Sequence, residues 1–411
     1  GIEIPRGYDD AIRLDKLHGH DKWQNATKLE MDQLHEYDTF HDKGIGTAPG
    51  EGFKKIRVHL VYAVKHDGRH KARLCANGNL TEVPIDSVYS GVVSLKSLRT
   101  VIFLAELNGL ETWATDIGNA YLEAKTSEKV FIIAGPEFGE LEGHTLVIFK
   151  ALYGLRTSGL RWSEKFSLCL RDMGFFPSLA DPRIWMHRVG DHCEHIAVCV
   201  DDLAIASKDP AGIVRALTDI PTKFKLKGAG PVEFHLGCDF FHDEEGVLCF
   251  ATRKHIEKLV ASCERMFGSK PKTSKITSPL VKGDHPEIDT SDLLEPKEIQ
   301  MYQSLVGSMQ WAVSLGRLDI ATAVMTLSGF QALPRVGHLE RAKRVVGYLA
   351  KMKHAVIRFR VSEPDYTDLP EYEYDWEQTV YGDVKEDLPT DAPEALGNYV
   401  TLTHYLDANL Y

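Results

Sequence analysis

The sequence predicts an α+β protein. Over about the first 250 residues, strand patterns alternate with helical patterns, and beyond them the helical patterns dominate. The clearest strand signal is HIAVCVDDLAIAS, in which two apolar runs flank Asp201 and Asp202. This pattern is typical of a strand, a tight turn and a second strand, with both aspartates at the tip.

The other elements follow in chain order. Residues 20–40 and 94–108 have helical periodicity, and residues 146–150 read as a strand. Residues 56–76 predict a hairpin that turns at Asp67-Gly68. Small-residue-rich helices are expected within 302–330 and another helix at 338–352. Residues 158–174 predict an amphipathic helix whose inward side chains suit a protein core better than a cofactor site: Trp162, Phe166, Leu170 and Met173.

Length and composition favour an intracellular globular protein. The chain of 411 residues is long for one domain, so two to four subdomains are expected. It contains no apolar run of about 18 residues and no signal peptide, which predicts no membrane partner. The seven cysteines form no CxxC pair, which favours reduced thiols over structural zinc. The first residue is Gly, not Met, as expected of a piece of a longer protein.

The net charge of −11 is concentrated in one segment. Residues 363–394 hold twelve acidic residues and one basic residue, so the rest of the chain is neutral. This Pro- and Tyr-rich stretch is interpreted as a linker or a surface-lying extension.

Two clusters of Lys and Arg remain, each with seven members. The first spans Lys54 to Arg73 and gives the predicted hairpin a cationic face for phosphate contacts, or merely a solvated one. The second spans Arg341 to Arg360. It gives the helix at 338–352 a basic face that either follows a duplex backbone or is a soluble surface.

A third carboxylate, Asp116, ends the predicted strand in LETWATDIGNAYLEA. Gly118 and Asn119 break that strand before a helical turn at 120–124. Two adjacent carboxylates repel by roughly 1 kcal/mol in water, and a hard cation such as Mg²⁺ removes that repulsion. Asp is also a common turn and cap residue. Three acidic residues at two strand ends nevertheless favour metal-dependent phosphoryl transfer.

Five segments in order resemble the Copia-type (Ty1/Copia) retrotransposon reverse transcriptases. They are TDIGNAYLEA, ALYGLRTSGLRW, VCVDDLAIAS, KFKLKGAGPVEFHLGCDF and the stretch from YQSLVGSMQW to HLERAKRVVGYL. The resemblance covers roughly residues 20–411.

The resemblance implies a right-hand polymerase fold of fingers, palm and thumb. An N-terminal extension and fingers would span 1–110, and the palm 111–253, with a fingers segment interleaved at about 122–165. A helical thumb or connection-like region would span 254–360, and an acidic linker 361–398. Residues 399–411 resemble the first strand of an RNase H domain, with Asp407 as its first carboxylate.

The resemblance also implies the site. Asp116, Asp201 and Asp202 would be the catalytic carboxylates and, with the carbonyl of Ile117, would bind two Mg²⁺ ions, Mn²⁺ being an alternative. The nucleotide would be held by Lys65, Arg69, Lys71, Arg73, Tyr121 and Tyr153, with Tyr121 excluding a 2′-hydroxyl. Contacts to the nucleic acid would come from Gly154, Arg156, Leu236 and Gly237, and the basic face of the helix at 338–352 would add Lys343 and Arg344. The proton donor to pyrophosphate would be one of Lys223, Lys225 and Lys227.

Three positions depart from the family pattern. Cys199 replaces a tyrosine, Asn77 a lysine and Gly159 a common proline. All three carboxylates are present, so the departures bear on fidelity and substrate preference more than on activity.

The sequence thus predicts an RNA-directed DNA polymerase of a retrotransposon Pol polyprotein, without a complete RNase H domain. Its partners would be an RNA or DNA template with a primer, and deoxynucleoside triphosphates. Its location would be a cytoplasmic virus-like particle or the nucleus, and homo-oligomers remain open. The alternatives are a polymerase with strong DNA-template or unprimed activity, a non-catalytic nucleic-acid-binding scaffold on the same fold, and a metal-dependent phosphodiesterase.

Overall fold

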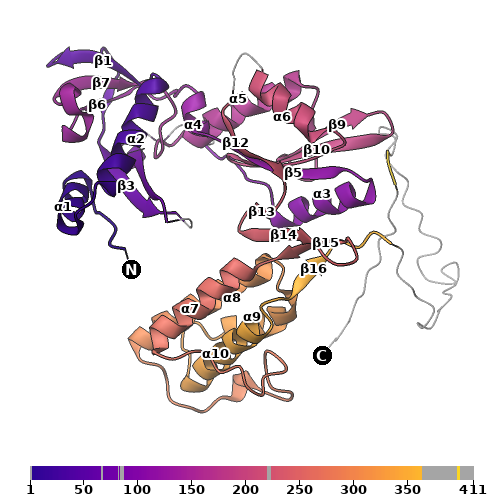
Figure 1. Ribbon diagram of the computed structural model, residues 1–411. Helices are drawn as coiled ribbons and strands as arrows, with labels where there is room; N and C mark the ends of the chain where they lie inside the picture. The colour runs from indigo at the N-terminus through magenta and orange to yellow at the C-terminus, as the bar shows by residue number, and fades with distance from the viewer. Residues whose placement is uncertain are drawn as a thin grey trace, which may run out of the picture.

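The computed structural model describes residues 2–65, 68–81, 83, 88–219, 224–362 and 396–398. These residues form three lobes arranged in an arc (Figure 1). The α+β class is confirmed, because strands dominate the first two lobes and helices the third. The predicted turn residue Asp67, the acidic stretch 363–394 and the RNase H-like segment 399–411 lie outside the described residues.

The N-terminal lobe combines two helices, a four-stranded sheet and a separate hairpin. The helices are α1 (Tyr8–His18) and α2 (Lys22–Glu36). The sheet has the order β1-β7-β6-β2, from β1 (Phe40–Ile45), β2 (Lys54–Lys55), β6 (Val130–Ile133) and β7 (His144–Ile148). The hairpin pairs β3 (Val58–Val64) with β4 (His70–Ala76), as predicted for 56–76. Short 3₁₀ helices η1 (Gly78–Leu80) and η2 (Pro136–Leu141) complete the lobe.

The central lobe is built on a six-stranded sheet with the order β12-β5-β11-β10-β9-β8. Its strands are β5 (Glu111–Ile117), β8 (Phe176–Pro177), β9 (Ile184–Val189), β10 (His192–Cys199), β11 (Asp202–Ser207) and β12 (Leu226–Pro231). Four helices accompany it: α3 (Leu95–Leu107), α4 (Ala120–Glu123), α5 (Ser158–Asp172) and α6 (Pro210–Asp219).

Alternation along β11 explains why helices cover both faces of this sheet. Leu203 and Ile205 belong to the core beneath α5 and α6, whereas Ala204 and Ala206 belong to the core beneath α3. Figure 1 shows α5 and α6 on one face and α3 on the other. Both faces are therefore buried, and the sheet is a rigid support for residues at its end.

A third, smaller sheet joins the central lobe to the helical lobe. It has the order β13-β14-β15-β16, from β13 (Phe234–His235), β14 (Cys238–His242), β15 (Leu248–Ala251) and β16 (Val356–Arg358). The region expected to be helical from 254 to 360 thus ends in a strand, which pairs Ala251 with Val356. The reason is that residues 356–358 form hydrogen bonds to β15, and local helical periodicity does not reveal such a long-range pairing.

The helical lobe contains α7 (Arg253–Phe267), α8 (Pro296–Ser314), α9 (Ala321–Ser328) and α10 (Val336–Lys351), with η3 (Pro286–Ile288) and η4 (Leu318–Ile320). Its apolar core includes the residues predicted on the inner face of α10: Leu339, Ala342, Val345, Val346 and Leu349. No helix among the described residues is long and apolar enough to cross a membrane.

The loop after α7 lies directly on α10 at Gly347. A Cβ atom added there would come within 2.1 Å of the carbonyl oxygen of Lys272. Gly307 in α8 is also helical, but a Cβ added there meets nothing within 4 Å. Packing therefore requires glycine at position 347 but not at position 307, so Gly307 can serve as the control for Gly347.

We expect Gly347→Ala to destabilise the protein by about 1–3 kcal/mol, because the new methyl forces the loop away from α10. The control Gly307→Ala should instead stabilise it by about 0.5–1 kcal/mol through helix propensity. The measurement is the shift of the unfolding midpoint in urea and by heat. Equal shifts for the two variants would contradict the close contact.

Candidate active site

The antiparallel register brings two of the three predicted carboxylates side by side. Asp202 on β11 is the direct cross-strand partner of Asp116 on β5. Asp201 precedes this pair, and its carbonyl accepts the backbone N–H of Ile117 at 2.8 Å. The prediction that both aspartates sit at the tip needs one correction. Cys199 pairs with Asp202, so the two turn residues are Val200 and Asp201, and Asp202 already belongs to the strand.

The turn is held in an unusual conformation. Val200 has a φ of 60°, a left-handed geometry that β-branched residues rarely adopt. Its carbonyl accepts the indole N–H of Trp162 on α5 at 2.7 Å. This bond, together with that of Ile117, fixes the backbone that carries Asp201.

Burial and mutual repulsion change the acidity of the carboxylates. Burial, then the charges of Asp201 and Asp116, raise the pKa of Asp202 to about 6. Burial and Asp116 also raise the pKa of Asp201, whereas Arg73 and Lys71 act in the opposite direction. The three acids therefore form one electrostatic group, with the cations of β4 close enough to influence it.

The cations of the hairpin line a small cavity between the N-terminal and central lobes. Lys65, Arg69 and Lys71 border this space of about 170 Å³ together with Asn119 and Lys227. Burial first, then the neighbouring cations Arg73, Lys65 and Lys227, lower the pKa of Lys71. An anionic ligand in this cavity would reduce the repulsion among these positive charges.

Glu30 lies behind this cationic strand. Its side chain is buried on α2 and accepts the backbone N–H of Leu74 at 2.9 Å. Its charge opposes the lowering of the pKa of Lys71. The carboxylate thus holds β4 from behind while the strand presents its cations.

Two of the three lysines considered as proton donors are described, and of these Lys227 lies beside the carboxylates. It is the cross-strand partner of Asp116, and a Cβ added at Gly118 would lie 2.9 Å from its Nζ. Lys225 instead pairs with Glu36 at 2.5 Å. Lys223 lies outside the described residues.

Tyr121 and Tyr153 form an aromatic pair beside the carboxylates. Their ring centroids are 4.9 Å apart, and the guanidinium of Arg73 lies over the Tyr153 ring at 5.1 Å. Burial first, and then Asp201, raises the pKa of Tyr121. Burial raises the pKa of Tyr153 to about 12, so both hydroxyls stay protonated.

The segment after Tyr153 connects the hairpin to the central lobe. A Cβ added at Gly154 would lie 2.1 Å from the carbonyl oxygen of Ala76, and one at Gly78 would lie 2.1 Å from that of Gly154. Arg156 donates from Nε to the Gly78 carbonyl at 2.9 Å. In the structure, then, Gly154 and Arg156 make intramolecular contacts that fix the end of β4.

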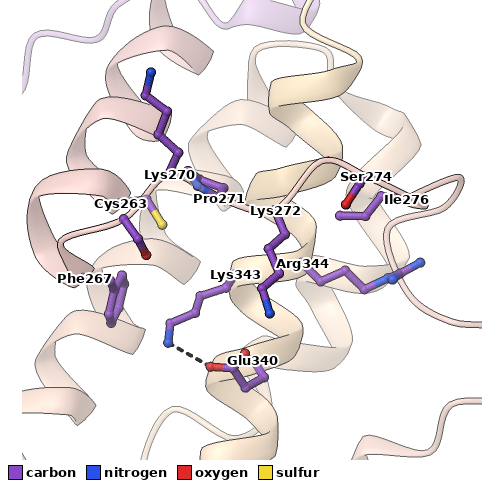
Figure 2. Close-up of a pocket in the computed structure, with 11 residues that line it drawn as sticks. Cys263, Phe267, Lys270, Pro271, Lys272, Ser274, Ile276, Glu340, Lys343 and Arg344 are labelled. Atoms are coloured by element: carbon purple, nitrogen blue, oxygen red, sulfur yellow. Dashed lines mark hydrogen bonds and ion pairs between the residues drawn. The ribbon is translucent and has the colours of Figure 1, made fainter.

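The other predicted nucleic-acid contacts lie elsewhere. Leu236 and Gly237 form the turn between β13 and β14, both with positive φ. Lys343 and Arg344 lie on α10 in the helical lobe and line a cavity of about 480 Å³ (Figure 2). The structure thus gathers the carboxylates, the hairpin cations and the two tyrosines, and keeps these four residues apart from them.

Comparison with known proteins identifies the family. A model of the reverse transcriptase (RNA-dependent DNA polymerase) family matches residues 47–277. The chain belongs to this family. The Copia-type resemblance is confirmed by relatives among plant and yeast transposons.

A Pol polyprotein from the tobacco (Nicotiana tabacum) transposon TNT 1-94 is 27% identical over 84% of this chain. The match spans only 26% of that relative, so this reverse transcriptase chain covers about a quarter of its length. A putative transposon Ty5-1 protein of Saccharomyces cerevisiae is 27% identical over 70% of this chain and 88% of its own. A foamy viral protease–reverse transcriptase solved with double-stranded DNA is 13% identical, with a TM-score of 0.45 over 80% of this chain and 48% of its own.

The carboxylates suit a divalent metal, which reverse transcriptases generally use. Their oxygens are hard donors. Burial first, and then the mutual repulsion of the carboxylates, raises the pKa values of Asp201 and Asp202, and a cation would compensate that repulsion. Within the described residues, no three His, Cys, Asp or Glu side chains are already arranged as a complete ligand set.

Two residues at this site carry no recognisable signal in the sequence. Trp162 is expected only in the core, and its indole N–H bond to the turn that carries Asp201 depends on tertiary structure. Glu30 lies in a stretch with helical periodicity, which does not reveal its bond to β4. Cys199, the departure from the family tyrosine, is half-buried, and burial followed by Asp202 and Asp201 raises its pKa to about 11.

We expect Asp202→Asn to stabilise the metal-free protein at pH 7. The pKa of Asp202 is raised from 3.8 in the unfolded chain to about 6 in the folded protein, so ionisation is less favourable in the folded protein. The stability of the wild type therefore falls as pH rises from about 4 through 6. After allowing for solvent screening, the gain should be on the order of 1 kcal/mol.

The measurement is the thermal unfolding midpoint at pH 4.5 and pH 7, in buffer that contains a metal chelator. The largest possible effect is about 1.4 kcal/mol of unfolding free energy for each unit by which the pKa is shifted. The exposed Asp172 on α5 provides the control variant Asp172→Asn. If the difference in unfolding midpoint between Asp202→Asn and the wild type were the same at pH 4.5 and at pH 7, the electrostatic argument would be contradicted.

Proposed function

We propose that the chain is the polymerase region of a retrotransposon Pol protein and adds deoxynucleotides to a primer 3′-hydroxyl on an RNA template. The observation that carries this proposal is the cross-strand pair of Asp116 and Asp202, with Asp201 on the adjoining turn. The N-terminal lobe corresponds to the fingers, and of the segment 122–165 it includes β6 and β7, whereas α5 from Ser158 packs on the central sheet. The six-stranded sheet corresponds to the palm and the helices α7–α10 to the thumb.

In this proposal the carboxylates of Asp116, Asp201 and Asp202 and the carbonyl of Ile117 hold two Mg²⁺ ions. When bound, these ions would activate the primer hydroxyl and neutralise the departing pyrophosphate. Lys65, Arg69, Lys71 and Arg73 bind and orient the triphosphate, because their charges border the same cavity or approach the same carboxylates. Crowding among these cations favours an anionic ligand over water.

Lys227 donates a proton to the leaving pyrophosphate. Its ammonium lies beside Gly118 and opposite Asp116, on the side of the cavity shared with Lys71. A positioned donor of this kind contributes typically about 10²–10⁴-fold to a rate. Lys225 is less suited, because Glu36 and the ring of Tyr37 already hold it.

Tyr121 provides a wall against the sugar, with Tyr153 supporting its ring from behind. Since Arg73 lies over Tyr153, the same pair also orients a triphosphate-binding cation. The nucleic-acid partner would be a primer–template, and the setting a virus-like particle formed by the transposon.

We expect Asp201→Asn and Asp116→Asn to reduce single-turnover primer extension by roughly a hundredfold or more, because an amide is a poor ligand for a hard cation. Affinity for the primer–template should change little, as measured by fluorescence anisotropy. Asp172→Asn is the control for loss of a carboxylate. Near-normal extension by either site variant would refute the assignment. A wild type that binds the primer–template without extending it would instead favour the non-catalytic scaffold.

We expect Tyr121→Val to admit ribonucleotides. Removing the ring opens space for a 2′-hydroxyl, so the ratio of kcat/KM for deoxy- over ribonucleotides should fall by roughly 10–200-fold. Tyr121→Phe keeps the ring and should keep the ratio. An active Tyr121→Val enzyme with unchanged discrimination would assign Tyr121 to the core instead.

A further inference from the structure

The segment that carries Tyr121 has little regular structure of its own. It follows Asn119, whose φ of 55° turns the chain out of β5, and it consists of the single helical turn α4. Within that turn the carbonyl of Tyr121 accepts the backbone N–H of Ala124 at 3.0 Å. A single helical turn is not stable by itself in water. The position of the Tyr121 ring therefore depends on contacts that other elements make with this segment.

Lys165 on α5 holds the C-terminal end of the turn. Its Nζ donates to the main-chain carbonyl of Glu123 at 2.7 Å and to the Glu123 carboxylate at 3.1 Å. The Glu123 side chain is only 10% exposed and that of Lys165 28%, so solvent screens this ion pair weakly. Carbonyls at the end of a helical turn have no partner within it, and a cation there forms a charge-assisted bond. Lys165 therefore fixes the backbone two residues beyond Tyr121.

The same helix borders the tip of the Tyr121 side chain and supports the carboxylates. A Cβ atom added at Gly159, near the start of α5, would lie 3.9 Å from the Tyr121 hydroxyl oxygen. Trp162, three residues before Lys165, donates to the turn that carries Asp201. Positions three residues apart lie on the same side of a helix. One side of α5 thus holds both the turn at the carboxylates and the turn that carries the tyrosine.

The start of the segment is held from other directions. The hydroxyl of Tyr37, at the end of α2, donates to the carbonyl of Gly118 in a long hydrogen bond of 3.5 Å. Burial first, and then the charge of Glu123, raises the pKa of Tyr37, so this hydroxyl stays protonated. The backbone N–H of Gly118 donates to the carbonyl of Lys225 at 2.8 Å. Tyr37 and Lys225 thus hold the start of the segment, and Lys165 holds its end.

We propose that Lys165 is a positioning residue for sugar selection, because its bonds to Glu123 hold α4 so that the Tyr121 ring stays against the nucleotide sugar. This inference rests on the proposed polymerase function and on Tyr121 as the wall. The ammonium of Lys165 is engaged by Glu123 and lies over the ring of Phe224 at 5.6 Å. It acts through the turn and not by touching the nucleotide. Without it, the end of the turn is released and the wall moves away from the 2′ position.

The test is a cycle of Lys165→Met, Tyr121→Val and the double variant. Lys165→Met keeps the length of the side chain and removes its charge. The ratio of kcat/KM for deoxy- over ribonucleotides should fall about tenfold, less than the loss in Tyr121→Val. The fall should come chiefly from a lower KM for the ribonucleotide. Because Tyr121→Val already lacks the wall, adding Lys165→Met to it should leave the ratio unchanged.

Two further variants separate positioning from general damage. Lys165→Arg retains a cationic donor and should restore most of the discrimination. The matched control Lys208→Met removes an exposed ion pair with Asp191, at 3.4 Å, and should keep the wild-type ratio. A merely structural role of Lys165 would instead lower the thermal unfolding midpoint and reduce kcat/KM for both sugars equally.

The outcomes decide the inference as follows. An active Lys165→Met enzyme with the wild-type ratio overturns it, and so does an additive loss in the double variant. If Lys165→Met does not fold, Glu123→Gln takes its place: it weakens the ion pair but keeps the bond to the carbonyl, and an unchanged ratio again overturns the inference. Failure of the proposed function is seen separately, as a wild type that does not extend a primer or as Tyr121→Val with an unchanged ratio, and the inference then falls with it.

Discussion

The antiparallel register between β5 and β11 is the constraint on which the site depends. It sets Asp116 opposite Asp202, and the backbone bond from Ile117 to the Asp201 carbonyl holds the adjoining turn. A slip of one residue would turn every side chain of β11 to the opposite face of the sheet. The alternation of large and small residues on β11, with α5 and α6 on one side and α3 on the other, prevents that slip. Packing on both faces thus maintains a cluster of repelling charges.

A second constraint fixes the end of the cationic hairpin β3–β4. The backbones of Gly154, Ala76 and Gly78 approach so closely that no side chain fits between them, and the Ala76 N–H donates to the Tyr153 carbonyl at 2.6 Å. The cations of β4 and the aromatic pair are consequently fixed by one contact. In the proposed polymerase, orientation of the triphosphate and selection of the sugar would therefore be mechanically linked rather than independent.

Local patterns predicted the elements well where hydrophobic periodicity was strong. The helices α2, α3, α5 and α10, the hairpin and the strands around Asp116 and Asp201 all occur near the expected residues. What the sequence could not supply was pairing over long distances, such as β16 with β15 or the four-stranded sheet built from 40–55 and 130–148. It predicted the carboxylates, but not the indole of Trp162 beneath them, because that hydrogen bond joins residues on separate elements.

The pairing of β15 with β16 has a mechanical consequence. The polypeptide leaves the small sheet at Ala251 and returns beside it at Val356, so all of α7–α10 lies between two neighbouring strands. The two covalent attachments of the lobe therefore lie side by side at one edge of the small sheet, and the bond from Arg99 on α3 to the Ser314 carbonyl adds a third connection to the central lobe. The same topology makes the lobe an insertion within a sheet edge.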